Sequence, residues 1–316
     1  MHHTAHHSTH HTPAARGRPA LVGRRFGRAL CGVFVLTVLL ASASMAGGLA
    51  EVKERGVLRH LGIPYANFVT GAGDGMDVEL MRAFAAHLGV RYEYVRSDWG
   101  AVIGDLTGRK VKSRGDEYEV VGEAPIRGDV IANGMTVIPW RAKVVAFADP
   151  TFPNQVWLVS RADLPVSPIK PTAVLDRDIL ATKALMPNRT LLGKANTCLD
   201  PELYDIKATG AKVAMFKGAL NELVPAVING ESELTLLDVP DALVALQKWP
   251  GEIKVIGPVS ERQDMAPAFR PGDNDLREAF NAFLKKMKAS GEFRRIALAY
   301  YPFVVDYFPD YLPDPR

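Results

Sequence analysis

The chain has 316 residues, of which 47% are hydrophobic and 23% charged. This length and composition suit a globular protein with two modest lobes and exclude a long array of independent domains. Five of the 38 basic residues lie in positions 1–46, where no acidic residue occurs, so 33 basic and 35 acidic residues remain in the rest. That near balance gives no support for a nucleic-acid partner.

The N-terminus predicts export. Three arginines, Arg24, Arg25 and Arg28, precede the apolar run 29–41, and small residues follow up to Ala46. This order is typical of a secretory signal peptide, and the apolar run is short for a transmembrane helix. We therefore expect residues 1–46 to be removed and the remainder to reach the periplasm.

The exported part contains few histidines and cysteines that could bind a metal or form a disulfide. Six of the eight histidines fall within the first eleven residues; we interpret this tract as an early start, with Val22 as a candidate true start, or as a tag. Cys31 precedes the apolar run, so it does not resemble a lipoprotein anchor. Cys198 is then the one cysteine left, which excludes an internal disulfide after cleavage.

Strand and helix patterns alternate from residue 57 onward. In the first half, the apolar spacing predicts strands at 57–63, 91–95 and 129–135 and helices at 76–88 and 101–106. The charged segment 110–127 interrupts this order and is interpreted as an inserted surface hairpin. The succession indicates an α/β architecture with a largely parallel sheet.

A second α/β unit follows Pro153. Its predicted strands are 156–159, 190–192, 212–216, 234–238 and 252–256, and its predicted helices are 200–206, 219–228 and 242–248. The C-terminal part is different, because two amphipathic helices are predicted there, at 274–290 and 293–300.

Several segments together resemble the family 3 extracellular solute-binding proteins, the periplasmic receptors of polar amino-acid ABC importers. The signature-like segment is DVIANGMTVIPWRAKVVAFADPTF, and the matching segments run along nearly the whole exported part: GVLRHLGIPYANF, GMDVELMRAFAAHLGVRYEYV, SDWGAVIGDL, LTLLDVPDAL and DNDLREAFNAFLKKMKASGEFRRIALAYY. Each segment alone is weak, whereas their common order and spacing are specific.

The resemblance implies a type II periplasmic-binding-protein fold, with two α/β lobes joined by a two-strand hinge. Lobe one would comprise residues 51–153 and 268–316, and lobe two residues 154–267. The chain would cross between the lobes near Phe152–Gln155 and Met265–Ala268. The implied function is that of a monomeric periplasmic binding protein that takes up an amino acid or related carboxylate and delivers it to the membrane permease of an ABC transporter.

The resemblance also assigns ligand-binding roles in lobe one. Arg141 stands where the family places the arginine for the ligand carboxylate, and a guanidinium suits that group because it donates two parallel hydrogen bonds. Thr136, together with Asn133 and Gly134, matches the additional carboxylate donors. Tyr65 and Trp99 match the positions of aromatic rings that stack against the ligand.

In lobe two, Asp238 matches the acidic residue for the ligand's α-amino group, although an aspartate there is also a common helix N-cap. Asn196 and Thr197 occupy the turn that faces the carboxylate in many relatives. Cys198 beside this turn departs from the family pattern; its alternatives are a reactive thiol near a helix N-terminus or, favoured here, a small buried apolar side chain.

Other departures from the family pattern leave alternatives to the binding-protein function open. Trp140 replaces a charged residue of the usual run before Arg141, and the tail 304–316 is extra. Alternatives to the binding protein are a periplasmic enzyme similar to cyclohexadienyl dehydratase and an accessory periplasmic protein of a redox system. No catalytic residue, metal-ligand spacing or cofactor motif is recognised in the exported part.

Overall fold

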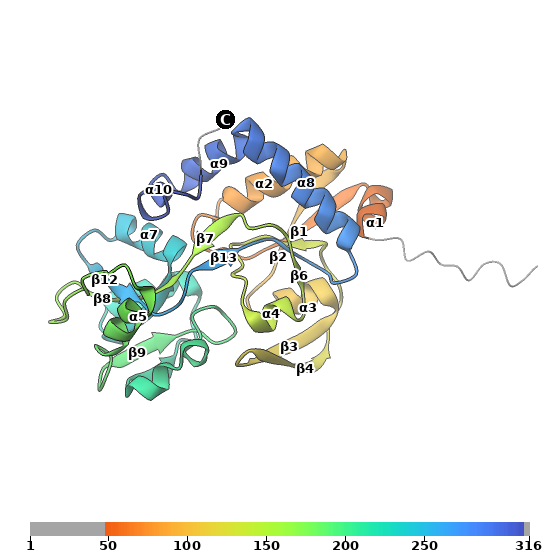
Figure 1. The fold of residues 1–316 in the computed structure, drawn as a ribbon. Helices are drawn as coiled ribbons and strands as arrows, with labels where there is room; N and C mark the ends of the chain where they lie inside the picture. Colours follow the sequence, from red (N-terminus) through yellow and green to blue (C-terminus); the bar gives the residue numbers. More distant parts are fainter. Residues whose placement is uncertain (1–47, 313–316) are drawn as a thin grey trace, which may run out of the picture. The chain divides into compact units, whose positions relative to one another are not determined.

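The computed structural model describes residues 48–312 of the chain (Figure 1). The predicted signal peptide, the histidine tract and Cys31 lie outside the described residues, as do the last four residues of the tail. Within residues 48–312 no helix is long and apolar enough to cross a membrane.

Lobe one, as we use the term, is built on a five-stranded mixed sheet with the order β2-β1-β5-β14-β6. The strands are β1 (Val57–Gly62), β2 (Arg91–Arg96), β5 (Val130–Ile131), β6 (Ala146–Phe147) and β14 (Ala268–Phe269). β1 pairs in parallel with β2 and β5, whereas β14, which returns from the end of the chain, is antiparallel to β5 and β6. β1 is almost wholly buried, whereas the edge strand β2 buries no residue fully and exposes four of its six residues.

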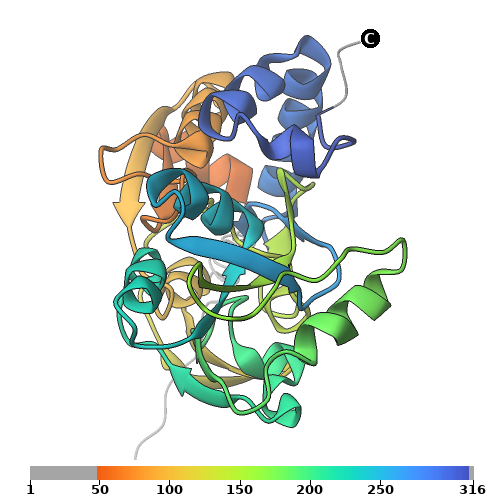
Figure 2. The same ribbon diagram turned by 90° about the vertical axis from the view of Figure 1, so that its left-hand side faces the viewer.

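The helices of lobe one are α1 (Gly48–Arg55), α2 (Met76–Leu88), α3 (Val102–Thr107), α4 (Pro139–Ala142), α8 (Asn274–Ser290), α9 (Glu292–Tyr300) and α10 (Val304–Tyr307). The C-terminal helices α8 and α9 pack beside α2 although nearly 200 residues separate them, as Figures 1 and 2 both show. Phe84 of α2 joins the two ends of the chain, because its ring centre lies 5.2 Å from that of Phe280 and 5.3 Å from that of Phe283.

Lobe two contains a second mixed sheet with the order β10-β9-β11-β8-β12. Its strands are β8 (Val156–Arg161), β9 (Thr190–Gly193), β10 (Lys212–Met215), β11 (Leu234–Asp238) and β12 (Ile253–Pro258). Its helices are α5 (Leu175–Lys183), α6 (Leu223–Ile228) and α7 (Val239–Lys248), with 3-10 turns at Pro201–Tyr204, Ile206–Thr209 and Leu220–Glu222. All five residues of the central strand β11 are buried, which agrees with its three leucines; the two polar residues, Thr235 and Asp238, are buried as well.

Two short antiparallel strands, β7 (Phe152–Asn154) and β13 (Gln263–Met265), connect the lobes. The Asn154 side chain donates to Thr136 Oγ1 of lobe one and accepts from the Val239 amide of lobe two. The tail reaches the same region, since the Tyr311 hydroxyl donates to the Thr151 carbonyl and its ring lies 5.3 Å from that of Phe152. The exact lobe boundaries at 153/154 and 267/268 stay a prediction.

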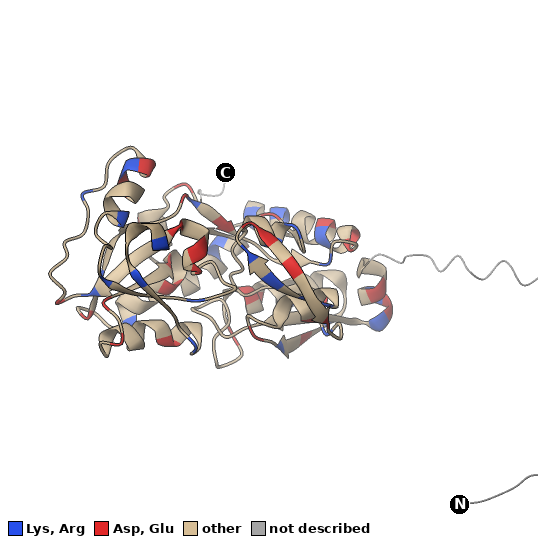
Figure 3. Cartoon of the chain, turned by 90° about the horizontal axis from the view of Figure 1, so that it is seen from below, with Lys and Arg blue, Asp and Glu red and all other residues tan. Residues whose placement is uncertain are grey.

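The inserted segment forms a hairpin of β3 (Arg109–Arg114) and β4 (Glu117–Glu123). Val111 and Tyr118 pack partly buried against the core of lobe one, while Val120 is half exposed. Charged residues of both signs are interspersed along the chain rather than gathered in one element (Figure 3), in keeping with the near balance of acids and bases beyond residue 46.

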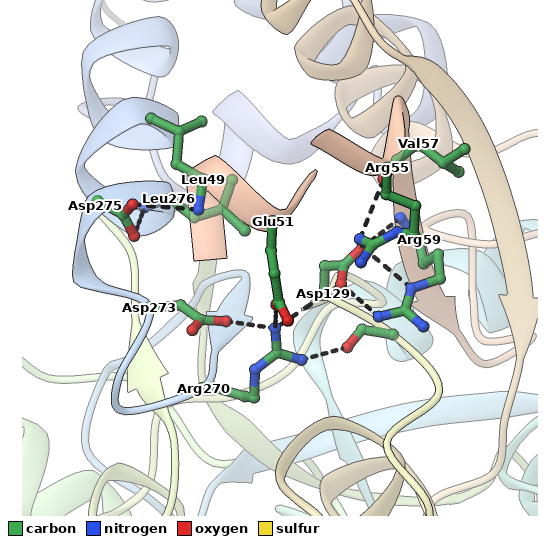
Figure 4. A network of polar contacts seen from close by, with 11 residues as sticks. Leu49, Glu51, Arg55, Val57, Arg59, Asp129, Arg270, Asp273, Asp275 and Leu276 are labelled. Carbon is green, nitrogen blue, oxygen red and sulfur yellow. Dashed lines mark hydrogen bonds and ion pairs between the residues drawn. The ribbon is translucent and has the colours of Figure 1, made fainter. Parts of the chain in front are cut away.

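A network of polar contacts fixes α1 and β5 to β1 (Figure 4). The fully buried carboxylate of Asp129 accepts from Arg55 at 2.6 Å and from Arg59 at 2.8 Å, and Arg270 lies 3.8 Å away. Arg270 in turn pairs with Asp273 at 2.7 Å. Each guanidinium is partly exposed, so Asp129 is the one fully buried charge of this set.

We expect Asp129→Asn to lower the free energy of unfolding by about 2 kcal/mol, because a hydrogen bond to a charged group contributes about 1.5–3 kcal/mol and the partly exposed guanidinium groups that remain keep part of their hydration. Urea unfolding measures this change. The matched control is Glu119→Gln in the exposed Arg114–Glu119 pair, for which we expect a loss below about 0.5 kcal/mol. Equal losses in the two variants would contradict a structural role for Asp129.

Candidate ligand-binding site

Arg141 lies at the centre of the candidate site. It belongs to the short helix α4, which begins at Pro139 directly after the extended residue Ile138, and its side chain is fully buried. Nη1 donates to the Thr136 carbonyl and Nη2 to the Asn196 carbonyl of lobe two, both at 3.1 Å. Nε is buried without a hydrogen-bond partner, and no acidic side chain among residues 48–312 forms an ion pair with this guanidinium.

Aromatic rings surround the Arg141 guanidinium. Its central carbon lies 5.5 Å from the ring centre of Trp99 and 5.5 Å from that of Trp140. Tyr65 stands edge-on to Trp99, with ring centres 5.6 Å apart. The faces of Trp99 and Trp140 stabilise the cation and keep water from it, but the two tryptophans supply no negative charge. Burial lowers the pKa of Arg141, although a guanidinium stays protonated in proteins.

Asp238 faces this arrangement from lobe two, at the end of β11. Its Oδ1 accepts hydrogen bonds from the Tyr65 hydroxyl of lobe one and from the Asp241 amide at 3.3 Å, and its Oδ2 accepts one from the Cys198 thiol at 3.3 Å. Asp238 is therefore also the N-cap of α7. Burial raises the pKa of Asp238, against the hydrogen bonds from Tyr65 and Cys198, which lower it.

The remaining predicted residues of lobe one differ in what they offer a ligand. Asn133 is fully buried, and neither atom of its side-chain amide has a partner. Gly134 adopts a left-handed φ of 66°, and its amide donates to Asp77 at 2.7 Å, so that donor is occupied. A Cβ at Gly134 would lie 2.3 Å from the Phe68 ring, which explains why glycine is required there. Thr136 accepts at Oγ1 from Asn154 and at its carbonyl from Arg141.

The turn of lobe two that contains Asn196 and Thr197 is stabilised by hydrogen bonds of its own side chains. The Thr197 hydroxyl donates to the Lys194 carbonyl at 2.7 Å and accepts from the Leu199 amide at 3.0 Å. Asn196 has a left-handed φ of 62° and contributes its carbonyl to Arg141. Its side chain accepts a hydrogen bond from Ser113 of the inserted hairpin at 3.4 Å.

Two further residues were not predicted as part of the site. Cys198 is buried, and burial together with the nearby Asp238 raises the pKa of its thiol well above the usual value. The thiol is thus a neutral donor to Asp238, as the favoured interpretation of a buried side chain implies. The Tyr204 hydroxyl donates to the Cys198 carbonyl at 2.5 Å. No sequence pattern relates these positions, because their contacts depend on how the loops of lobe two fold back.

Asp77 at the start of α2 supports the loop that carries Gly134. It is fully buried, and burial raises its pKa to about 7, while the hydrogen bond from the Gly134 amide opposes this shift. The folded protein therefore prefers protonated Asp77, and its stabilisation is greatest below the unfolded pKa near 4 and is lost as the pH rises through about 7.

We expect Asp77→Asn, which imitates the protonated acid, to remove this pH dependence. Between about pH 5 and pH 8 the unfolding free energy of the wild type should fall relative to that of the variant by on the order of 3 kcal/mol. Urea unfolding at the two pH values measures it, with the exposed Asp116→Asn as control. If the difference in unfolding free energy between the variant and the wild type stays constant with pH, the raised pKa of Asp77 is refuted.

Among residues 48–312, no group of three or more histidine, cysteine, aspartate or glutamate side chains is arranged to hold a metal ion. The site instead offers a buried cation in lobe one and a buried carboxyl in lobe two, near the two strands that join the lobes. Together, the two mixed sheets and the two strands that join them have the architecture of two-lobed proteins with the type II periplasmic-binding-protein fold.

Comparison with known proteins agrees with this class. Residues 126–303 match the family model of the bacterial extracellular solute-binding proteins, family 3. The match covers more than half of the chain, and the protein belongs to this family.

A probable amino-acid ABC transporter-binding protein of Haemophilus influenzae is 23% identical over 84% of this chain and 92% of its own length. A membrane-bound lytic murein transglycosylase F of Desulfosudis oleivorans is 28% identical over 75% of this chain, and the match spans 46% of the transglycosylase. The chain thus corresponds to about half of that relative.

Solved structures show the same fold. A mutant of ArgBP from T. maritima superposes with a TM-score of 0.64 at 26% identity, over 81% of this chain and 99% of that one. An ancestral amino-acid-binding protein described as a precursor of cyclohexadienyl dehydratase superposes with a TM-score of 0.63 at 23% identity, over 81% of this chain and 99% of that one. The second likeness bears on the fold alone.

Proposed function

We propose that the protein binds an amino acid between its two lobes, with the α-carboxylate on Arg141 and the α-ammonium on Asp238. The observation that carries this proposal is the state of Arg141: a fully buried guanidinium with an unpartnered Nε that forms no ion pair with an acidic side chain of residues 48–312. A ligand carboxylate is the anion that this fork fits.

The energetics favour a ligand over a purely structural role. Burial of an unpaired charge costs several kcal/mol. The two carbonyl groups that accept from Arg141 reduce this cost but do not neutralise the charge. A carboxylate placed against the guanidinium gains charge-assisted hydrogen bonds in a site that Trp99 and Trp140 shield from water.

Asp238 complements Arg141 from the other lobe. Its carboxyl is fully buried, and among residues 48–312 no lysine or arginine forms an ion pair with it. An ammonium group is the partner that a buried carboxylate lacks, and its arrival would favour the ionised form that burial disfavours. The hydroxyl of Tyr65 and the thiol of Cys198 then hold the carboxylate in place from either side.

Contacts between the lobes suggest how binding is coupled to closure. The Tyr65 hydroxyl reaches Asp238, the Arg141 guanidinium reaches the Asn196 carbonyl, and the Ala66 amide donates to Asn221 Oδ1 at 3.4 Å. A ligand touching both lobes would stabilise the closed arrangement by its greater affinity for it. The membrane permease of an ABC transporter would recognise that closed form.

The rest of the proposal follows from the family and the N-terminal sequence. We propose export to the periplasm through the signal peptide 1–46, action as a monomer, and lobes that comprise residues 51–153 with 268–316 and residues 154–267. Similarity to an amino-acid ABC transporter-binding protein over most of both chains supports delivery to an importer.

We propose binding without turnover. The likeness to transglycosylases covers less than half of the relative of Desulfosudis oleivorans, and the dehydratase precursor bears on the fold alone. Incubation of the purified protein with prephenate separates the alternatives: unchanged prephenate is expected, and its conversion would establish an enzyme.

A thermal-shift screen tests the function. A ligand that binds only the folded state raises the unfolding temperature. At a concentration 100 times the dissociation constant, it adds about 2.7 kcal/mol to the free energy of unfolding. We expect at least one of the standard L-amino acids to produce such a shift. A shift with polyamines or with organic acids lacking an amino group, and with no amino acid, would overturn the proposal.

A further inference from the structure

A cavity of about 550 Å³ opens beside the proposed amino-acid site, between residues of both lobes. Trp99 belongs to both places: its ring covers the Arg141 guanidinium, and it also lines the cavity. The ring of Trp99 therefore lies between the Arg141 guanidinium and this cavity, which we call the outer compartment. A ligand whose α-carboxylate lies on Arg141 would reach the compartment if its side chain passed the Trp99 ring.

The outer compartment is lined by three cationic side chains and one acidic side chain: Arg96, Lys194, Lys217 and Asp98. The carboxylate of Asp98 already accepts from the amides of Gly100 at 2.8 Å and Ala101 at 3.0 Å, at the start of α3. No carboxylate in residues 48–312 forms an ion pair with any of the three cations. The compartment thus carries an excess of positive charge, which Asp98 and the nearby charge of Glu222 offset only in part.

Lys194 is the best positioned of these cations. Its ammonium donates to the carbonyls of Phe216, at 3.3 Å, and Gly218, and it lies 5.8 Å from the centre of the Phe216 ring. An ammonium has three N–H donors, so one remains for a ligand. Because the side chain is already held, little conformational freedom is lost when a ligand binds. The charge of Glu222 acts on Lys194, but the Glu222 carboxylate accepts from the Ala219 amide and forms no ion pair with that lysine.

From this arrangement, and resting on the proposed amino-acid function, we infer that the ligand carries a second anionic group on its side chain and that Lys194 selects it. The ligand class is then the acidic amino acids. A cationic side chain such as that of arginine would enter a compartment that already holds three cations, and like-charge contact disfavours it. The specificity inferred here differs from that of the arginine-bound solved relatives.

Calorimetric titration of the full exported protein with L-glutamate, L-aspartate, L-glutamine and L-arginine tests the inference. We expect an acidic amino acid to bind at least about tenfold more tightly than glutamine, since a charge-assisted hydrogen bond is roughly twice as strong as a neutral one, and arginine to bind most weakly. Lys194→Gln should abolish the preference for the acidic ligand. The control Lys212→Gln removes an exposed lysine outside the compartment and should leave the preference unchanged.

The failures of the two proposals are distinguishable. Binding of glutamine or arginine as tight as that of both acidic amino acids would overturn the inference and leave the amino-acid function in place. Retention of the preference in Lys194→Gln would exclude this lysine as the selecting group. Absence of binding for every amino acid, in a protein with a cooperative unfolding transition, would overturn both proposals.

Discussion

Arg141→Ala is expected to abolish amino-acid binding and to leave the unfolding temperature of the ligand-free protein equal to that of the wild type or higher. The guanidinium would supply the one cationic partner of the ligand carboxylate, and the loss of one partner from a buried charge pair costs about 2–5 kcal/mol, or roughly 30-fold to several thousand-fold in affinity. The fully buried side chain forms no ion pair with an acidic side chain of residues 48–312, although the charge of Asp238 acts on it. Its removal relieves the cost of burying the charge, and this relief offsets the loss of its hydrogen bonds to the Thr136 and Asn196 carbonyls.

Calorimetric titration with L-glutamate and L-glutamine, together with thermal unfolding, measures both effects. Arg141→Lys keeps the charge and loses the planar fork, so we expect intermediate affinity. The control is Arg91→Ala, at an exposed position of β2. Wild-type affinity in Arg141→Ala would exclude the carboxylate role, and a large drop in unfolding temperature would point to a structural role instead.

Asp238→Asn is expected to weaken amino-acid binding by at least about tenfold, because an amide replaces the charge that pairs with the ligand's ammonium. The Tyr65 hydroxyl and the Asp241 amide both donate to Oδ1, and the asparagine keeps that acceptor oxygen, so the N-cap of α7 survives. Burial raises the pKa of Asp238; its ionised form is disfavoured in the folded state, and the variant should be at least as stable as the wild type near pH 7.

The experiment compares Asp238→Asn with Asp163→Asn, which changes an exposed carboxylate of the same lobe. Titration with L-glutamate and with glutarate, which lacks the α-amino group, separates the causes. A general disturbance of the site would weaken both ligands equally. Loss of the ammonium partner should weaken glutamate and leave glutarate unaffected or improved, and the opposite order would refute the assignment.

Much of the fold follows from local sequence. The predicted strands at β1, β8 and β11 are buried in the structure although each includes polar residues, and the spacing in α2 and α8 predicts helices whose phenylalanines meet in the core. The predicted strand 129–135 was too long, because only Val130 and Ile131 remain in the ladder before the backbone turns at the left-handed Gly134.

Other elements escaped prediction for physical reasons. Helix α5 buries only Asp178 and Thr182 and leaves Leu180 68% exposed, so it has no apolar stripe to reveal it. The four-residue helix α4 is too short for any periodic signal. The hairpin was expected, with one weak strand at residues 118–121. The structure extends that strand to Glu117–Glu123 and pairs it with Arg109–Arg114, whose charged sequence gives no strand signal.

The individual site residues were predicted by resemblance, whereas their partners were not. Arg141 and Asp238 could be located by the segments around them, but the contacts of Asp238 with Tyr65 and Cys198 join positions 173 and 40 residues away. Such contacts arise only when the two lobes and the loops of lobe two come together. The same holds for the outer compartment, where Arg96 and Lys194 belong to different lobes.

The central claim is that the two buried charges recognise the α-carboxylate and the α-ammonium of one amino acid. The most direct test is titration of the wild-type protein with L-glutamate, with γ-aminobutyrate, which lacks the α-carboxylate, and with glutarate, which lacks the α-amino group. We predict binding of glutamate and a loss of at least about tenfold in affinity for each analogue. Equal affinity for all three compounds would contradict the claim.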